Sequence, residues 1–249
     1  MITLKSEEEI EKMAQACRVV AKALDYMGEM VKPGITTKEI DRFADDYIRS
    51  QNALPAFKGY RGYPASICAS VNNEVIHGIP SDRLLEEGDI IGIDLGAYKD
   101  GFYGDAAYTF PVGRIDEKAE RLLKITEESL YRGIENARPG KRLSDISCAI
   151  QQHVEANGFS VVRAFVGHGI GRDLHEDPQV PNFGTPGRGL RLRSGMTLAI
   201  EPMVNDGGYE VAVLDDGWTA VTLDGGLSAH FEHTIVITSA EPIILTKIA

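Results

Sequence analysis

The sequence predicts an α+β fold in which two similar halves, each with a pair of helices followed by strands, surround a central antiparallel sheet. This prediction depends on two observations. The order of helix and strand signals occurs twice along the 249 residues, and the sequence itself repeats at a nearly constant offset. Each half would be small for an independent core, so we expect one domain over 1–249, with halves of roughly 1–112 and 113–249.

The helices of the first half have clear start and stop signals. Ser6 followed by Glu9 has the pattern of a capping box, and apolar residues then recur at helical spacing. Pro33-Gly34 should end this helix. A second helix should begin near Thr36 or Thr37.

The second half repeats this order. A long helix should end at Pro139-Gly140, and another should open at Ser144. The segment 32–34 matches 138–140 at an offset of 106 residues, and the segment 85–94 matches 192–201 at an offset of 107. A Pro-Gly helix stop can recur by chance, but two matches at nearly the same offset indicate an internal repeat. Asp94 and Glu201 therefore occupy equivalent places in the two halves.

Two strands of the first half, predicted over 90–95 and 102–112, meet at Lys99-Asp100-Gly101, which favours a tight hairpin. With Lys99-Asp100 as the loop, Asp94 lies directly opposite Asp105. With Asp100-Gly101 as the loop, the two are diagonal neighbours. Either register puts both carboxylates on one face, with Cβ atoms about 4.5 to 8 Å apart, where like charges repel strongly when dehydrated. A bound cation would remove this repulsion.

Carboxylates also interrupt two apolar strands that we predict in the second half. Glu201 lies in the segment 198–204, and Glu232 lies in the segment 231–237. A single acidic residue in a strand is usually exposed at an edge, but these residues lie among neighbours that should be buried. Unpaired burial would cost several kcal/mol or force protonation, and no Lys or Arg lies in these strands. The array of carboxylates therefore indicates cations.

His168 is the candidate neutral ligand, and the glycines around it at 167, 169 and 171 should let the backbone turn sharply. A lone His in a loop is more often structural, so this assignment depends on the carboxylates. The glycines also resemble a dinucleotide fingerprint, but Arg172 stands where that motif needs Gly, and no helix follows. Four carboxylates and one imidazole match two divalent ions, and the set suits Mn²⁺, Fe²⁺, Co²⁺ or Zn²⁺ without choosing among them.

Composition argues against several classes of protein. The formal net charge of −11, with no dense run of Lys or Arg, argues against nucleic-acid or anionic-membrane partners. The acidic start of the chain has no apolar signal-peptide core, and no apolar run is long enough to span a bilayer. Cys17, Cys68 and Cys148 suggest neither a disulfide framework nor a Cys-based zinc site. We therefore expect a cytoplasmic protein.

These residues together resemble the type I methionine aminopeptidases, which are metallopeptidases of the creatinase-like pita-bread fold. The resemblance covers essentially the whole chain, and its motifs are specific as a set although each is weak alone. They lie in the segments 70–80, 93–96, 103–105, 167–171, 174–176, 200–202 and 231–234. The resemblance implies a single catalytic metallopeptidase domain that removes the N-terminal methionine of nascent proteins when the second residue is small.

The resemblance also implies how the ligands divide between two metal ions. Asp105 and Glu232 would bridge the ions, and Asp94 would chelate one of them. His168 and Glu201 would complete the other. Glu201 would in addition carry a proton from the attacking water to the leaving amine.

Substrate contacts follow from the same resemblance. His77 would contact the substrate near the scissile amide, and His175 would stabilise the oxyanion that develops on the carbonyl. An aromatic and sulfur-containing pocket suits a flexible thioether. Its lining would be Phe57, Tyr60, Tyr63, Cys68 and Trp218, with Leu174 at the rim.

Three positions differ from the commonest pattern of these enzymes. Phe57 stands where many relatives have Cys, Leu174 stands where many have Phe, and His230 stands where many have Gln. His230 should share the face of Glu232 and act at most behind the ligands. Ordinary core packing explains Cys68 and Leu174 nearly as well as a pocket does. We expect structural roles for the two remaining histidines, His153 and His233.

Two alternatives remain open from the sequence. A proline-directed aminopeptidase or prolidase would share the ligands but usually carries a large additional N-terminal domain. A pita-bread protein that only binds peptides would have lost ligands that are all present here. The expected partners are nascent polypeptide N-termini, which the chain could meet at the ribosome, and the expected state is a monomer.

Overall fold

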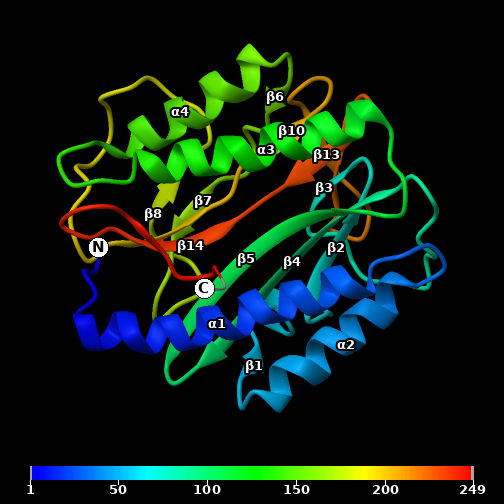
Figure 1. The fold of residues 1–249 in the computed structure, drawn as a ribbon, viewed down its shortest axis with the longest axis horizontal. Helices are drawn as coiled ribbons and strands as arrows, with labels where there is room; N and C mark the ends of the chain where they lie inside the picture. The colour runs from blue at the N-terminus through cyan, green and yellow to red at the C-terminus, as the bar shows by residue number, and fades with distance from the viewer. Residues whose placement is uncertain (1, 248–249) are drawn as a thin grey trace.

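The computed structural model describes residues 2–247 and confirms the α+β class. Helices α1 (Glu7–Met30) and α2 (Thr37–Ser50) open the first half, and α3 (Glu117–Glu135) and α4 (Leu143–Ala156) open the second. Figure 1 shows the two helix pairs along opposite sides of the view, with the long strands visible between α1 and α3. The order that occurs twice in the sequence is thus reproduced in space.

The helix starts follow the predicted capping signals. The Ser6 hydroxyl accepts a hydrogen bond from the Glu9 N–H, and the Glu9 carboxylate accepts one from the Ser6 N–H. A second capping box opens α2. Helix α4 begins at Leu143, one residue before the predicted position, because the Asp145 carboxylate accepts the N–H of Arg142 and satisfies the helix start there.

All strand pairs among residues 2–247 are antiparallel, as predicted, but these residues form four separate hydrogen-bonded sheets. In the first, β4 pairs with β1, β2 and β5. The others have the strand orders β15-β14-β9-β7-β8, β13-β10-β6 and β11-β12-β3. A short 3₁₀ turn spans Tyr60–Gly62. The strands are β1 (Leu54–Pro55), β2 (Ile67–Val71), β3 (Glu74–Ile76), β4 (Ile90–Lys99), β5 (Phe102–Pro111), β6 (Ser160–Val161), β7 (Gly167–Gly169), β8 (Glu176–Val180), β9 (Thr197–Ile200), β10 (Met203–Asn205), β11 (Val211–Val213), β12 (Ala220–Thr222), β13 (Ser228–His230), β14 (His233–Val236) and β15 (Ile243–Ile244).

The β4–β5 hairpin turns at Asp100-Gly101, whose φ angles of 50° and 88° are both positive, as a tight two-residue hairpin turn requires. Asp94 pairs with Ala107, and Asp105 pairs with Gly96. The two carboxylates are therefore diagonal neighbours on one face, which is the second of the two predicted registers.

Helix α1 covers the other face of this hairpin. It approaches β5 so closely at Gly104 that a Cβ there would lie 2.7 Å from the backbone nitrogen of Cys17. Ile93 and Leu95 of β4 lie in the core cluster that includes residues of α1 and α2. Successive strand residues point to opposite faces, so Asp94 and Asp105 point away from these helices.

The two halves join along β5. The Thr234 hydroxyl donates to the carbonyl of Asp105 at 2.7 Å and accepts from its N–H at 3.1 Å. The Glu232 N–H donates to the carbonyl of Ala107 at 2.9 Å. This junction fixes the backbone of an acidic residue from each half, so it sets their separation.

Replacing Thr234 with Val should lower the free energy of unfolding by about 1–3 kcal/mol, because Thr234 is fully buried and both of its bonds to the Asp105 backbone would be lost. Chemical denaturation measures the change. Thr126→Val is the matched control, since its buried hydroxyl bonds only a carbonyl within α3, at Leu122. If both variants lose the same free energy of unfolding, the Thr234 bonds to Asp105 contribute no more than an ordinary buried hydroxyl.

Candidate metal centre

Glu201 and Glu232 lie in a gap between strand pairs, which corrects the prediction that both are inside strands. Strand β9 ends just before Glu201, and β14 begins just after Glu232. On one side of the gap Ile200 of β9 pairs with His233 of β14, and on the other Met203 of β10 pairs with His230 of β13. The two pairs have the same register, so Glu201 lies opposite Glu232. Pro202 has no N–H to give to the ladder, which explains the interruption.

His168 lies on strand β7, so the prediction of a loop with a sharp turn was wrong. The glycines on either side allow close approach instead. A Cβ on Gly167 would lie 2.4 Å from the carbonyl oxygen of Ala199, and one on Gly169 would lie 2.2 Å from that of Asp177. Only glycine permits these contacts with the neighbouring strands, so the motif holds the imidazole inside a tightly packed sheet.

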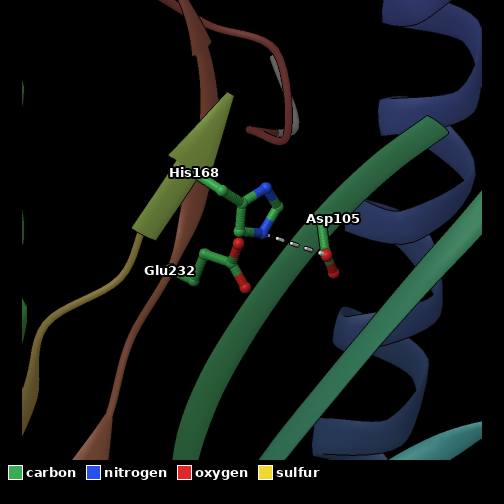
Figure 2. A group of neighbouring side chains, drawn as sticks. All are labelled: Asp105, His168 and Glu232. Carbon is green, nitrogen blue, oxygen red and sulfur yellow. Dashed lines mark ion pairs between the residues drawn. The ribbon is translucent and has the colours of Figure 1, made fainter. Parts of the chain in front are cut away.

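The structure brings the five candidate ligands from both halves together. One ligand atom each from Asp105, His168 and Glu232 lie within 4.8 Å of one another, and Figure 2 shows the three side chains converging from separate strands and the segment before β14. The Nε2 atom of His168 lies 3.6 Å from Glu201 Oε1 and 4.0 Å from Asp105 Oδ2. Asp94 shares the face of Asp105 on the adjacent strand.

The hydrogen bond of His168 orients its ring for coordination. Its Nδ1 lies 2.8 Å from the carbonyl oxygen of Gly169, which can only accept, so Nδ1 carries the proton. Burial, and then the neighbouring His175, lower the pKa of His168 to about 3. The neutral ring therefore presents the lone pair of Nε2 to the carboxylates.

The carboxylates have the properties of an incomplete metal site. Within residues 2–247, one oxygen each of Asp94, Asp105 and Glu232 is buried without a hydrogen-bond partner. Burial, followed by the charge of Asp105, raises the pKa values of Asp94, Glu201 and Glu232 well above the ordinary range. Divalent cations would satisfy these oxygens and remove the repulsion, so the residues present fit divalent metal ions.

A pocket of about 140 Å³ opens over this cluster. Its lining includes every site residue selected from the sequence: Phe57, Tyr60, Tyr63, Cys68, His77, Asp94, Asp105, His168, Leu174, His175, Glu201, Trp218 and Glu232. A larger groove of about 520 Å³ between α1 and α3 contains only one of the five candidate ligands. The chemistry therefore belongs to the smaller pocket.

The apolar wall of the pocket depends on close packing. Tyr63 and Trp218 meet edge to face, with ring centroids 5.1 Å apart. A Cβ on Gly96 would lie 3.0 Å from the ring of Phe57, so this glycine makes room for the aromatic side chain. Gly92, on the same strand, has only ordinary contacts at its Cβ position.

Two histidines lie at the mouth of the pocket. His77 has a positive φ of 59°, which a non-glycine residue adopts only where its surroundings hold it. Burial, and then His175, lower the pKa of His77 to about 4, so its ring is neutral. His175 shares a 2.9 Å hydrogen bond with the Tyr60 hydroxyl, and partial burial and the charge of Arg61 lower its pKa.

Sequence reasoning missed two groups that act on the site. Arg61 lines the pocket, and no motif distinguished it from other surface arginines. Lys5 is buried and forms a 2.5 Å ion pair with Glu176, which follows His175 directly. Glu176 also accepts the N–H of Arg172 at 2.8 Å, so this pair anchors the loop that carries His175. Nothing near Lys5 in sequence could have revealed a partner so distant in the chain.

The three remaining histidines, His230, His233 and His153, lie outside the pocket lining. His230 is buried, and its Nε2 lies 3.6 Å from Glu201 Oε2, behind the ligand cluster. His233 points the opposite way, toward Tyr131 of α3. His153 of α4 lies 2.9 Å from the Glu128 carboxylate of α3 and links the two helices.

Residues 11–239 match the model of metallopeptidase family M24. The chain belongs to this family. It is 59% identical over 248 residues to a methionine aminopeptidase of Clostridium perfringens, with complete coverage of both chains. It also superposes on the crystal structure of a methionine aminopeptidase from Thermotoga maritima with a TM-score of 0.98 at 51% identity, again with complete coverage of both.

Among M24 metallopeptidases the fold is shared with prolidases. The prolidase of Pyrococcus horikoshii matches with a TM-score of 0.79 and 25% identity, over 99% of this chain but 64% of that one. The pita-bread fold and the resemblance to methionine aminopeptidases are therefore confirmed. An M24 metallopeptidase uses divalent metal, in keeping with the carboxylates described above.

Proposed function

We propose that this chain is a methionine aminopeptidase that removes the N-terminal methionine of new polypeptides when the next residue is small. The observation that carries the proposal is the buried cluster of carboxylates and imidazole at the base of an apolar pocket. Full-length relatives that are named methionine aminopeptidases support it. Proline-directed cleavage is less well supported, because the prolidase is 25% identical to this chain whereas the methionine aminopeptidase of Thermotoga maritima is 51% identical.

The metal ligands in this proposal are Asp94, Asp105, His168, Glu201 and Glu232, and they would hold two divalent ions of Co, Mn, Fe or Zn. Two ions balance four carboxylates, whereas one would leave the pocket strongly anionic. Asp105 and Glu232, which meet at the junction of the halves, would be shared by both ions. When bound, the ions polarise the substrate carbonyl and make water nucleophilic at neutral pH.

The protein side chains supply positioning and proton transfer. Glu201 would take the proton of the attacking water and deliver it to the leaving amine, since its carboxylate faces both the cluster and the pocket. His175 would donate to the carbonyl oxygen as negative charge develops there. His77, on the Trp218 side of the pocket, would hold the substrate near the scissile amide.

The methionine side chain would lie among Phe57, Tyr60, Tyr63, Cys68, Leu174 and Trp218. The proposed partners are the N-termini of nascent polypeptides at the ribosome. The enzyme would act there as a monomer in the cytoplasm. None of the helices formed within residues 2–247 is both long and apolar enough to cross a membrane.

The metal-loaded protein should hydrolyse Met-Ala-Ser with a kcat/KM at least tenfold above that for Ala-Pro-Ser. The pocket offers apolar surface to a long first side chain such as methionine, and the alanine of Ala-Pro-Ser would leave most of this surface unused. Release of the first amino acid, methionine from one peptide and alanine from the other, is followed by chromatography and gives the two rates. Preferential cleavage of the Xaa-Pro peptide would favour the proline-directed alternative, and stoichiometric metal without either activity would favour a binding module.

A further inference from the structure

Arg61 is the only lysine or arginine that lines the pocket within the described part of the chain. The protein has 37 acidic residues against 26 basic ones, yet Arg61 is exposed and forms no ion pair with any of residues 2–247. The preceding basic residue, Lys58, is paired, because its Nζ reaches Asp45 at 3.2 Å. Arg61 thus keeps its charge available at the pocket mouth.

The backbone and the ring of Tyr60 hold Arg61 in place. Its φ of 49° is positive, a conformation that costs a non-glycine residue about 1 kcal/mol or more. Gly59 and Gly62, with φ angles of 87° and 92°, form the turn around it. The guanidinium carbon lies 5.3 Å from the centroid of the Tyr60 ring, within cation–π range. An arginine that is freely solvated would need neither this backbone conformation nor the contact with the Tyr60 ring.

A row of neighbouring side chains connects Arg61 with the metal cluster. Tyr60 stacks on His175 with centroids 5.2 Å apart, and His175 lies 4.3 Å from His168. The path from His175 to the guanidinium therefore has two steps of 5.2 and 5.3 Å. An extended peptide advances about 3.3 Å per residue, so the guanidinium lies within about three residues of an amide that His175 contacts.

We propose that Arg61 recognises an acidic side chain at the third or fourth residue of the substrate. This inference rests on the proposed function, because it takes the N-terminal methionine to lie in the pocket and the chain to leave past Tyr60. Arg61 offers paired N–H donors that fit a carboxylate, and its stacking on Tyr60 reduces the freedom it would lose on binding. The enzyme therefore discriminates among nascent chains beyond the small second residue.

The test compares peptides Met-Ala-Xaa-Ser and Met-Ala-Ser-Xaa, in which Xaa is Glu, Gln or Lys, with the metal-loaded enzyme at low salt. At one of the two positions, wild type should cleave the Glu peptide about three- to tenfold faster in kcat/KM than the Gln peptide, with Lys slowest. Added salt should shrink this ratio, since the contact is at an exposed mouth. Arg61→Gln should bring the Glu-to-Gln ratio close to one, and Arg61→Lys should restore part of it.

Lys58→Gln is the matched control, because it removes a nearby positive charge that is already paired and lies outside the pocket. It should keep the wild-type ratio. Equal rates for Glu and Gln peptides in wild type, or a preference that survives in Arg61→Gln, would overturn the inference. So would an Arg61→Gln variant that slows every peptide equally. Failure to cleave any of the peptides would overturn the proposed function itself, and the inference with it.

Discussion

Asp105→Asn should lower kcat/KM for Met-Ala-Ser by at least about 100-fold while the protein stays folded. Asn has nearly the same shape, so the Thr234 bonds to the backbone of residue 105 remain. The loss comes from removing the charge that the two ions would share. Peptide turnover, circular dichroism and the metal content of the purified variant together separate lost ligation from lost structure.

The metal-free variant should be at least as stable as the metal-free wild type, because the charge of Asp105 is the first electrostatic cause of the raised pKa values of its three acidic neighbours. Asp100→Asn is the control: it removes one charge from the same hairpin, at the exposed turn, where Asn tolerates the positive φ. It should retain wild-type turnover. Turnover near wild type in Asp105→Asn would overturn the ligand assignment.

Removal of divalent metal should abolish peptide turnover and lower the melting temperature. A ligand that binds only the folded state at 100 times its Kd adds about 2.7 kcal/mol of stability. For a chain of this size that corresponds to a rise in Tm of about 5–10 °C per ion. Scanning calorimetry of the metal-free protein with added Mn²⁺ measures this shift, and atomic absorption measures the stoichiometry. Two ions per chain are expected.

The stabilisation should grow as the pH rises from about 5 to 8, because carboxylates must lose their protons before they coordinate. Calcium, which takes oxygen ligands and gains little from the His168 imidazole, serves as a control ion and should shift the Tm less. A Tm that Mn²⁺ leaves unchanged, or turnover that persists after exhaustive chelation, would rule out the proposed centre.

Much of the fold follows from local signals in the sequence. The capping box of Ser6 and Glu9 works through groups three residues apart, so neighbouring residues alone decide where α1 begins. The Asp100-Gly101 turn likewise depends on the ability of two adjacent residues to adopt positive φ. The sequence left the register of the β4–β5 hairpin open between two choices, because Lys99-Asp100 could also have formed the loop.

The sequence singled out most of the residues that line the pocket, but not their local structure. Carboxylates among apolar residues stand out in any sequence, since their burial is unfavourable without partners. The strand position of His168 was missed because glycine signals both turns and close packing, and only the Ala199 and Asp177 carbonyls show which applies. Arg61 was missed because an exposed arginine has no distinctive pattern until its neighbours are known.

The sequence by itself determined where α1 and α2 begin, the duplicated architecture and the acidic residues among apolar neighbours, because each follows from short-range chemistry or from a repeated pattern. Only the tertiary structure decided that Glu201 lies opposite Glu232, that Thr234 links the halves at Asp105, and that Lys5 anchors the His175 loop. These relations join residues far apart in the chain. Their geometry depends on sheet register and packing, which no local pattern encodes.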